Sequence, residues 1–570
     1  MIGGEDIIGA AGPGKGRLPV RRDLGKGRGA GGPRGRHRPV LLATVSALTM
    51  MLNAGAVRAQ ATNVDGGAEI TVPGDHDSPW SLGGNLRVGY TGTGTLRIEA
   101  GATVSNTIGY IGYGSGSNGA VTVSGDGSTW QNSGELNVGY SGEGTLIIED
   151  GGSVTSWLTY IGSEANSVGT VTVTGDGSTW QNDNNLYVGN KGIGALTVEN
   201  GGTVSALAVV LGSALGGTGT LTLAGTEGAR GVLAMRQMVR GSGGATFTLD
   251  GGLLRATMDQ ANFMFGFAPG DVTVADGGAF IDSNGHDIGI GATLGGTGGL
   301  TKLGAGTLTL TGLNSYAGGT AINGGTLVVA TNARLGDAAG GLSFDGGTLR
   351  TTASFTIPRT TTLGPGGGTF ETEAGTTLTH AGIISGPGQL TKNGAGTLKL
   401  TGLNSYTGGT LVLGGELVVD TDSLPGDVTV DSGAFLTFEQ DTDGTYTGVI
   451  SGAGGVRVNG DGTLTFTALQ AYDGEIEIAG VLQAAAESLR GNVSIAAGGA
   501  LVLNQAADGS YAGDIGGSGD LVKTGAGTAI LAGNLAHGGQ TIVNAGTLRI
   551  NGTLAGLATV GAGAVASILK

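Results

Sequence analysis

The sequence predicts an all-β protein, a right-handed parallel β-helix (solenoid) preceded by a signal peptide, and its composition is the first reason. Glycine supplies 123 of 570 residues, about three times the usual ~7%. Proline numbers only 11 and cysteine is absent, which excludes collagen and disulfide frameworks. Apolar residues make up 39% of the chain and recur at regular intervals, which argues against disorder. The class of protein that these observations leave is a repeat protein rich in β-structure.

Residues 1–61 are predicted to be a signal peptide with an extended basic n-region. Nine Lys/Arg and three acidic residues occur within residues 1–38. An apolar run follows from Val40 to Leu52 and leads to Ala59-Gln60-Ala61. A basic region, a short apolar segment and a small-x-small site are typical of export signals, with cleavage between Ala61 and Thr62. The run is too short for a membrane-spanning helix, which needs about 20 residues.

Residues 62–224 are predicted to form a β-helix of 25-residue coils. Segments such as Gly144-Thr-Leu-Ile-Ile148 recur every 25 residues, and each unit contains three short strand signals separated by turn residues. No unit can bury its apolar face alone, so stacked coils would share one narrow core. Trp80, Trp130 and Trp180 lie 50 residues apart. We expect them in the core, and the alternative is a stacking ladder for carbohydrate on the outer face.

Residues 225–292 interrupt the repeat and are predicted to be an irregular junction between two kinds of coil. Alternating phenylalanines in this region favour a strand with one buried face. The alternative is an exposed, locally basic patch for a partner. The residues of this predicted partner patch are Arg236, Arg240, Phe263, Phe265 and Phe267.

Residues 293–555 carry a second repeat. Leu300-Thr-Lys-Leu-Gly-Ala-Gly-Thr-Leu-Thr-Leu-Thr-Gly312 is followed by Asn314-Ser-Tyr-Ala-Gly-Gly-Thr320, and the pattern recurs ninety residues later, with two weaker copies beyond. It resembles the passenger-associated β-strand repeat of Gram-negative autotransporter proteins. The resemblance implies a β-helical passenger carried to the cell surface by a C-terminal barrel, serving adhesion, autoaggregation or other host-facing roles.

Residues 556–570 are expected to be a short tail without the translocator barrel that the resemblance implies. On that expectation, the chain is either a truncated gene product or depends on a barrel from another chain. We expect an exported protein, at the cell surface and outer membrane or secreted, and periplasmic if no barrel is supplied.

The sequence predicts no catalytic residue, no cofactor and no metal site. The densest polar cluster, Asp282-Ser-Asn-Gly-His-Asp287, is read as a turn between strands. The formal net charge of −16 disfavours nucleic acid as a partner, since a basic patch would be needed.

The function predicted from these observations is a non-enzymatic surface rod for adhesion or autoaggregation. Its partners would be further copies of the chain, or glycans or proteins on a host or cell surface, held through many weak contacts of Thr/Ser/Asn ladders. Two alternatives remain open, namely a polysaccharide-active β-helix enzyme and a non-functional passenger that lacks its barrel.

Overall fold

The computed structural model describes residues 60–555 and 558–568. The predicted signal peptide, residues 1–61, lies almost wholly outside the described residues. The first strand, β1 (Thr62–Val64), begins directly after the predicted cleavage site. Among the described residues, no helix has the length and apolar character needed to cross a membrane.

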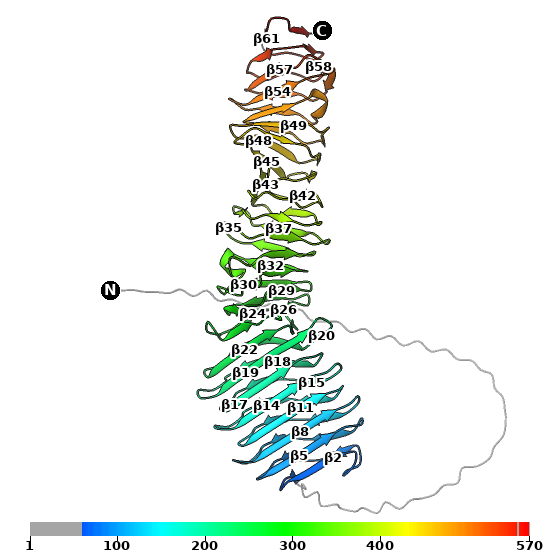
Figure 1. The fold of residues 1–570 in the computed structure, drawn as a ribbon, viewed down its shortest axis with the longest axis vertical. Coiled ribbons are helices and arrows are strands. Elements are labelled where there is room, and N and C mark those ends of the chain that lie inside the picture. Colours follow the sequence, from blue (N-terminus) through cyan, green and yellow to red (C-terminus); the bar gives the residue numbers. More distant parts are fainter. Residues whose placement is uncertain (1–59, 556–557, 569–570) are drawn as a thin grey trace, which may run out of the picture. The chain divides into compact units, whose positions relative to one another are not determined.

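The described residues form an all-β parallel solenoid of about 23 turns, which confirms the predicted all-β class and the parallel stacking of coils. Most strands pair with the corresponding strands of the coils before and after them, as the stack in Figure 1 shows. Antiparallel pairing between described strands is confined to a hairpin of β19 (Thr218–Thr226) and β20 (Ala229–Arg230), and one isolated antiparallel bridge joins Ala224 to Gly251. Short connections between parallel strands suit repeats that contact only their neighbours.

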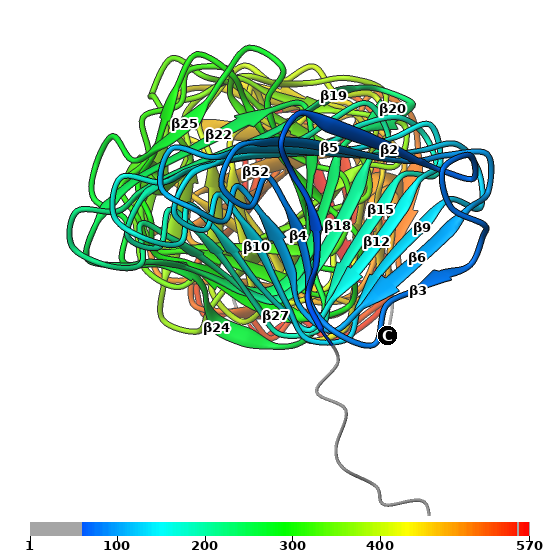
Figure 2. The same cartoon turned by 90° about the horizontal axis from the view of Figure 1, so that it is seen from below.

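The N-terminal coils have three faces, which surround the interior when viewed along the stack (Figure 2). The first face contains β2 (Ala68–Val72), β5 (Thr93–Ile98), β8 (Asn118–Ser124), β11 (Glu143–Glu149), β14 (Val168–Val173), β17 (Ile193–Val198), β19, β22 (Gly244–Asp250), β25 (Val272–Val274) and β28 (Leu294–Gly296). The second face contains β3 (Trp80–Ser81), β6 (Thr103–Asn106), β9 (Thr129–Asn132), β12 (Ser153–Ser156) and β15 (Thr179–Asn182). The third contains β1, β4 (Leu86–Val88), β7 (Gly109–Ile111), β10 (Glu135–Val138), β13 (Leu158–Ile161) and β16 (Asn185–Val188). The second and third faces continue together through β18 (Thr203–Leu211).

Inward-facing residues of successive coils stack in register and build a continuous core. Val121, Leu146 and Val171 occupy one column and are almost completely buried. Trp130 and Trp180 are also buried, so the prediction that they belong to the core is confirmed for these two. Trp80 is half-buried and stacks on His76 with ring centroids 4.0 Å apart.

Parallel coils continue through residues 225–292. Strand β21 (Val232–Arg240) pairs with β18 on one side and with β23 (Leu253–Ala256) and β24 (Gln260–Phe265) on the other. The irregular features are the β19–β20 hairpin and a register shift between Gln260 and Met264. The stack is therefore unbroken where the repeat type changes.

The second repeat forms shorter coils. The first copy supplies β29 (Leu300–Leu303), β30 (Thr307–Leu310), β31 (Thr320–Ile322) and β32 (Thr326–Val329). The second copy supplies β40 (Leu390–Asn393), β41 (Thr397–Leu400), β42 (Thr410–Val412) and β43 (Glu416–Val419). Two 3₁₀ turns, Asn332–Arg334 and Ala486–Ser488, interrupt this part. The buried Arg359 holds the loop after the first turn by donating to the carbonyls of Gly336 and Gly340 at 2.7 and 2.8 Å.

Candidate functional site

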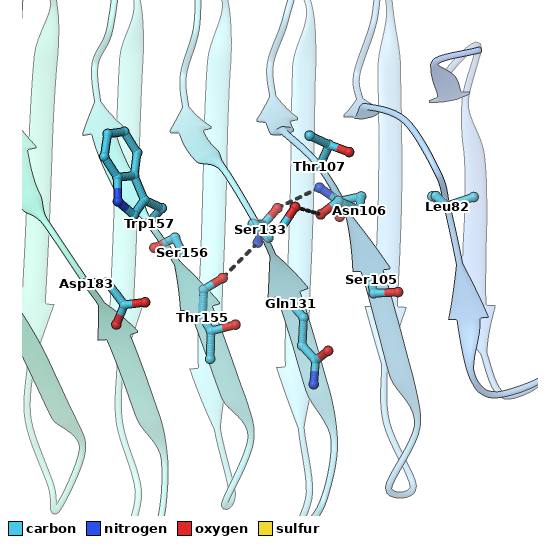
Figure 3. A pocket seen from close by; sticks show the side chains of 11 residues that line it. Leu82, Ser105, Asn106, Thr107, Gln131, Ser133, Thr155, Ser156, Trp157 and Asp183 are labelled. Atoms are coloured by element: carbon cyan, nitrogen blue, oxygen red, sulfur yellow. Dashed lines mark hydrogen bonds between the residues drawn. The ribbon is translucent and has the colours of Figure 1, made fainter. Parts of the chain in front are cut away.

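A groove of about 480 Å³ crosses five successive N-terminal coils where the second face turns into the third. We call it the Trp157 groove, and Figure 3 shows its side chains projecting from neighbouring strands. The lining residues are Leu82, Ser105, Asn106, Thr107, Gln131, Asn132, Ser133, Thr155, Ser156, Trp157 and Asp183.

The floor of the Trp157 groove is a ladder of buried polar side chains at the ends of β6, β9 and β12. The Trp130 indole N–H donates to Asn106 Oδ1 at 2.7 Å, and Asn106 Nδ2 donates to Asn132 Oδ1 at 2.8 Å. Asn132 Nδ2 continues the chain to the carbonyl of Thr155 at 3.3 Å. Buried amides whose hydrogen bonds are satisfied by each other hold a fixed geometry, so the floor is rigid without a ligand.

One wall of the groove is the indole of Trp157, whose side chain is 50% exposed. Trp157 directly follows the last residue of β12, and its backbone N–H donates to the carbonyl of Gly134 at 2.9 Å. Extending the strand register by one residue aligns it with Thr107, Ser133 and Asp183 of neighbouring coils. A large aromatic ring therefore stands beside polar residues at the equivalent positions that line the groove.

The rim of the groove is polar and carries little charge. The side chains of Gln131, Ser133 and Asp183 are exposed, and the Asp183 carboxylate accepts a hydrogen bond from Gln181 Nε2 at 2.7 Å. Among the described residues that line the groove, Asp183 is the one that carries a charge. The groove thus combines an aromatic face with hydroxyl, carboxamide and carboxylate groups.

A tyrosine ladder runs along the third face. The stacked rings of Tyr160 and Tyr187 have centroids 5.0 Å apart, and those of Tyr113 and Tyr140 lie 5.2 Å apart. The Arg87 guanidinium lies 4.5 Å from the Tyr113 ring centroid. Because these rings pack against one another, they stabilise neighbouring strands.

A threonine ladder lies on the outside of the first face. Its members pair directly across β14, β17, β19, β22 and β25 and are all half-buried; they are Thr172, Thr197, Thr222, Thr248 and Thr273. Parallel strands are spaced ~4.8 Å apart, so hydroxyl groups repeat along this face at that interval.

The predicted partner patch does not exist as one exposed cluster, and this part of the prediction needs correction. Phe263 and Phe267 are buried in the core, because their side chains from β24 and the following turn point inward. Phe265 is half-buried, and Arg240 forms an ion pair with Asp271 at 2.8 Å. Of the five residues, Arg236 alone is exposed.

The sequence reasoning overlooked Trp157. The available signal was its place in the 25-residue repeat, where the equivalent positions are Thr107, Ser133 and Asp183. Because the residues at these equivalent positions are polar, an aromatic residue at position 157 is expected to be exposed. Trp130 and Trp180 instead occupy positions whose equivalents in other coils are apolar.

The polar cluster of residues 282–287 makes local contacts. Asp282 pairs with Arg255 at 2.9 Å, and His286 Nδ1 lies 3.1 Å from Asp259. The described residues contain no group of three or more His, Asp or Glu side chains arranged to hold a metal ion. These contacts join adjacent coils.

Comparison with known proteins gives two matches. Residues 300–329, 390–419 and 521–550 match the passenger-associated transport repeat, and they are three of the four copies of the second repeat. A 247-residue stretch is 37% identical to the adhesin BmaC autotransporter of Brucella suis biovar 1 (strain 1330). It covers 42% of this chain and 7% of that adhesin, so the chain matches a small part of its relative. With the parallel solenoid, these matches show a chain that is similar to autotransporter passengers and carries passenger-associated transport repeats.

Proposed function

We propose that this passenger is a non-catalytic surface rod for adhesion and autoaggregation. In this proposal, residues 1–61 direct export and are cleaved between Ala61 and Thr62. The solenoid winds to the right, and an outer-membrane translocator delivers it to the cell surface. The matched relative is named an adhesin, which supports a contact role over a catalytic one.

The threonine ladder is the observation that carries the proposal. Half-buried Thr172, Thr197 and Thr222 follow one another on successive strands. Each hydroxyl is both a hydrogen-bond donor and an acceptor, and a second solenoid lying alongside would offer the same spacing. Individually weak contacts that form in parallel give avidity without a strong single site.

The test uses beads coated with the purified full chain, with aggregation of the beads and their retention on animal cells as readouts. We expect the unaltered chain to aggregate the beads. The double variant Thr172→Lys/Thr222→Lys, which places long charged side chains two coils apart on the ladder, should reduce aggregation several-fold.

The matched control is Leu215→Lys/Leu313→Lys, which adds the same charge at side chains that are 88% and 66% exposed. This variant should aggregate like the parent, and circular dichroism should show the same β-structure in all three proteins. Beads that neither aggregate nor adhere would refute the proposed function, and equal aggregation by both variants would refute the role of the ladder.

A further inference from the structure

We infer that the Trp157 groove binds a neutral oligosaccharide. The inference rests on the proposed adhesive function and names a ligand class for a site that the threonine ladder does not include. It follows from the exposed aromatic ring, the fixed polar groups around it and the charge of the lining.

Trp157 is the first argument. The chain has four tryptophans; Trp130 and Trp180 are buried and Trp80 is half-buried against His76. Half of the Trp157 side chain is exposed, although such a residue gains stability when buried. An indole face beside a groove offers an apolar platform on which the C–H face of a sugar ring can pack, with polar groups nearby to orient it.

The polar groups of the groove are the second argument. Neighbouring hydroxyl groups of a sugar form hydrogen bonds with a protein group that has a donor and an acceptor side by side. The exposed Gln131 carboxamide has both. The Asp183 carboxylate accepts on the far side of Trp157. The Asn106–Asn132 ladder beneath is already hydrogen-bonded, so little conformational entropy is lost when a ligand is bound.

Charge selects the class of sugar. The lining contains Asp183 and no Lys or Arg, so uronic, sialic or sulfated sugars would meet a negative charge with no compensating cation. A single carboxylate also suits binding rather than hydrolysis, which uses a pair of carboxyl groups flanking the scissile bond.

The shape of the groove favours a thin chain over a second solenoid. It crosses five coils, or ~19 Å at the spacing of parallel strands, and runs along the stack. A flat β-sheet face would meet the projecting Trp157 ring before it reached the floor. An extended oligosaccharide lying beside the ring meets no such obstacle.

The experiment titrates the purified full chain with short neutral gluco-, manno- and galacto-oligosaccharides and with sialylated and sulfated ones. Binding is followed by calorimetry and by protection of tryptophan fluorescence from quenching by acrylamide. Quenching reports mainly on the exposed Trp157. We expect at least one neutral oligosaccharide to bind and protect the fluorescence, and the anionic ones to bind at least tenfold more weakly.

Three variants locate the binding. Trp157→Ala should weaken it at least tenfold, Trp157→Tyr should retain most of it, and Leu207→Ala, the matched control in the same column at 42% exposure, should leave it unchanged. Absence of binding by every neutral oligosaccharide, or equal binding by Trp157→Ala, would overturn the inference. Bead aggregation by Trp157→Ala, measured in parallel, separates this outcome from failure of the proposed function, because the threonine ladder is intact in that variant.

Discussion

Three buried lysines show what single residues contribute to the second repeat. Lys302 Nζ donates to the carbonyls of Leu303, Gly304 and Gly324 at 2.7, 2.8 and 3.2 Å, and Lys392 and Lys523 make the equivalent contacts in their copies. Burial lowers the pKa of Lys302 to about 8. Each lysine thus satisfies three carbonyls at a corner, and these hydrogen bonds offset part of the desolvation cost.

His380 gives a pH-dependent prediction at the same scale. Its Nε2 lies 2.7 Å from Thr361 Oγ1 and its Nδ1 lies 3.1 Å from the carbonyl of Gly382. The neutral ring fits this arrangement, with Nδ1–H donating to the carbonyl and Nε2 accepting from the hydroxyl. Burial lowers the pKa of His380 to about 4, below the value of about 6.5 for an unfolded chain.

The stability that depends on neutral His380 is fully present above about pH 6.5 and is lost as pH falls toward 4, because the unfolded state binds the proton more tightly. The pKa difference corresponds to about 3 kcal/mol. We expect amide hydrogen exchange in β38 (Thr377–His380) and its neighbours, corrected for intrinsic rates, to accelerate between pH 7 and pH 4.

His380→Gln should lose the steep part of this pH dependence. His286→Gln is the control, since His286 is partly exposed and paired with Asp259, and it should keep the dependence of the parent. An unchanged pH profile in His380→Gln would show that other groups cause the acid sensitivity.

At the scale of the coil, a close approach of two strands explains one column of glycines. A Cβ atom added at Gly169 would lie 2.2 Å from the carbonyl oxygen of Val138 and 2.6 Å from the backbone nitrogen of Gly162. Val138 ends β10 in the preceding coil and Gly162 directly follows β13, so neither atom can move without displacing its strand. Only glycine fits at this position in β14.

Gly169→Ala should therefore destabilise its coil, by about 1–3 kcal/mol if the strands shift as in other overpacked cores. Hydrogen exchange should show faster opening in β11, β14 and β17 and unchanged protection beyond residue 390, because each coil contacts only its neighbours. Gly516→Ala is the control, since its added Cβ would have its nearest neighbour at 4.0 Å. Equal protection in both variants would contradict the steric explanation.

Side chains also replace missing strands within a coil. Asn404 lies between β41 and β42, where no strand forms; its Oδ1 accepts the N–H of Ile384 at 2.8 Å and its Nδ2 donates to the carbonyl of Ser423 at 2.7 Å. Asn314 bridges Leu294 and Arg334 in the same way. The asparagine of the repeat motif therefore links three successive coils by hydrogen bonds. In the sequence it looks like an ordinary turn residue, and this role is not visible there.

For the molecule as a whole, the net negative charge opposes self-association, and the threonine ladder favours it. The chain carries a net charge of −16, which repels parallel copies, while the threonine ladder is uncharged. Raising the ionic strength from about 0.01 M to about 0.15 M shortens the Debye length from ~30 to ~8 Å. We expect bead aggregation by the full chain to increase over this range, as measured by turbidity.

The Thr172→Lys/Thr222→Lys variant provides the comparison, and it should remain poorly aggregating at both ionic strengths. If salt instead dispersed the beads coated with the unaltered chain, then ion pairs rather than polar ladders would hold the copies together.

The sequence by itself determined the parallel solenoid and the kinds of coil, because every coil repeats the same inward apolar positions and each needs a neighbour to bury them. The burial of Trp130 and Trp180 followed from the same pattern. Only the tertiary structure decided which outward residues meet. Trp157 forms a groove wall and Arg240 pairs with Asp271, because contacts between outward side chains of different coils depend on packing that the repeat pattern does not specify.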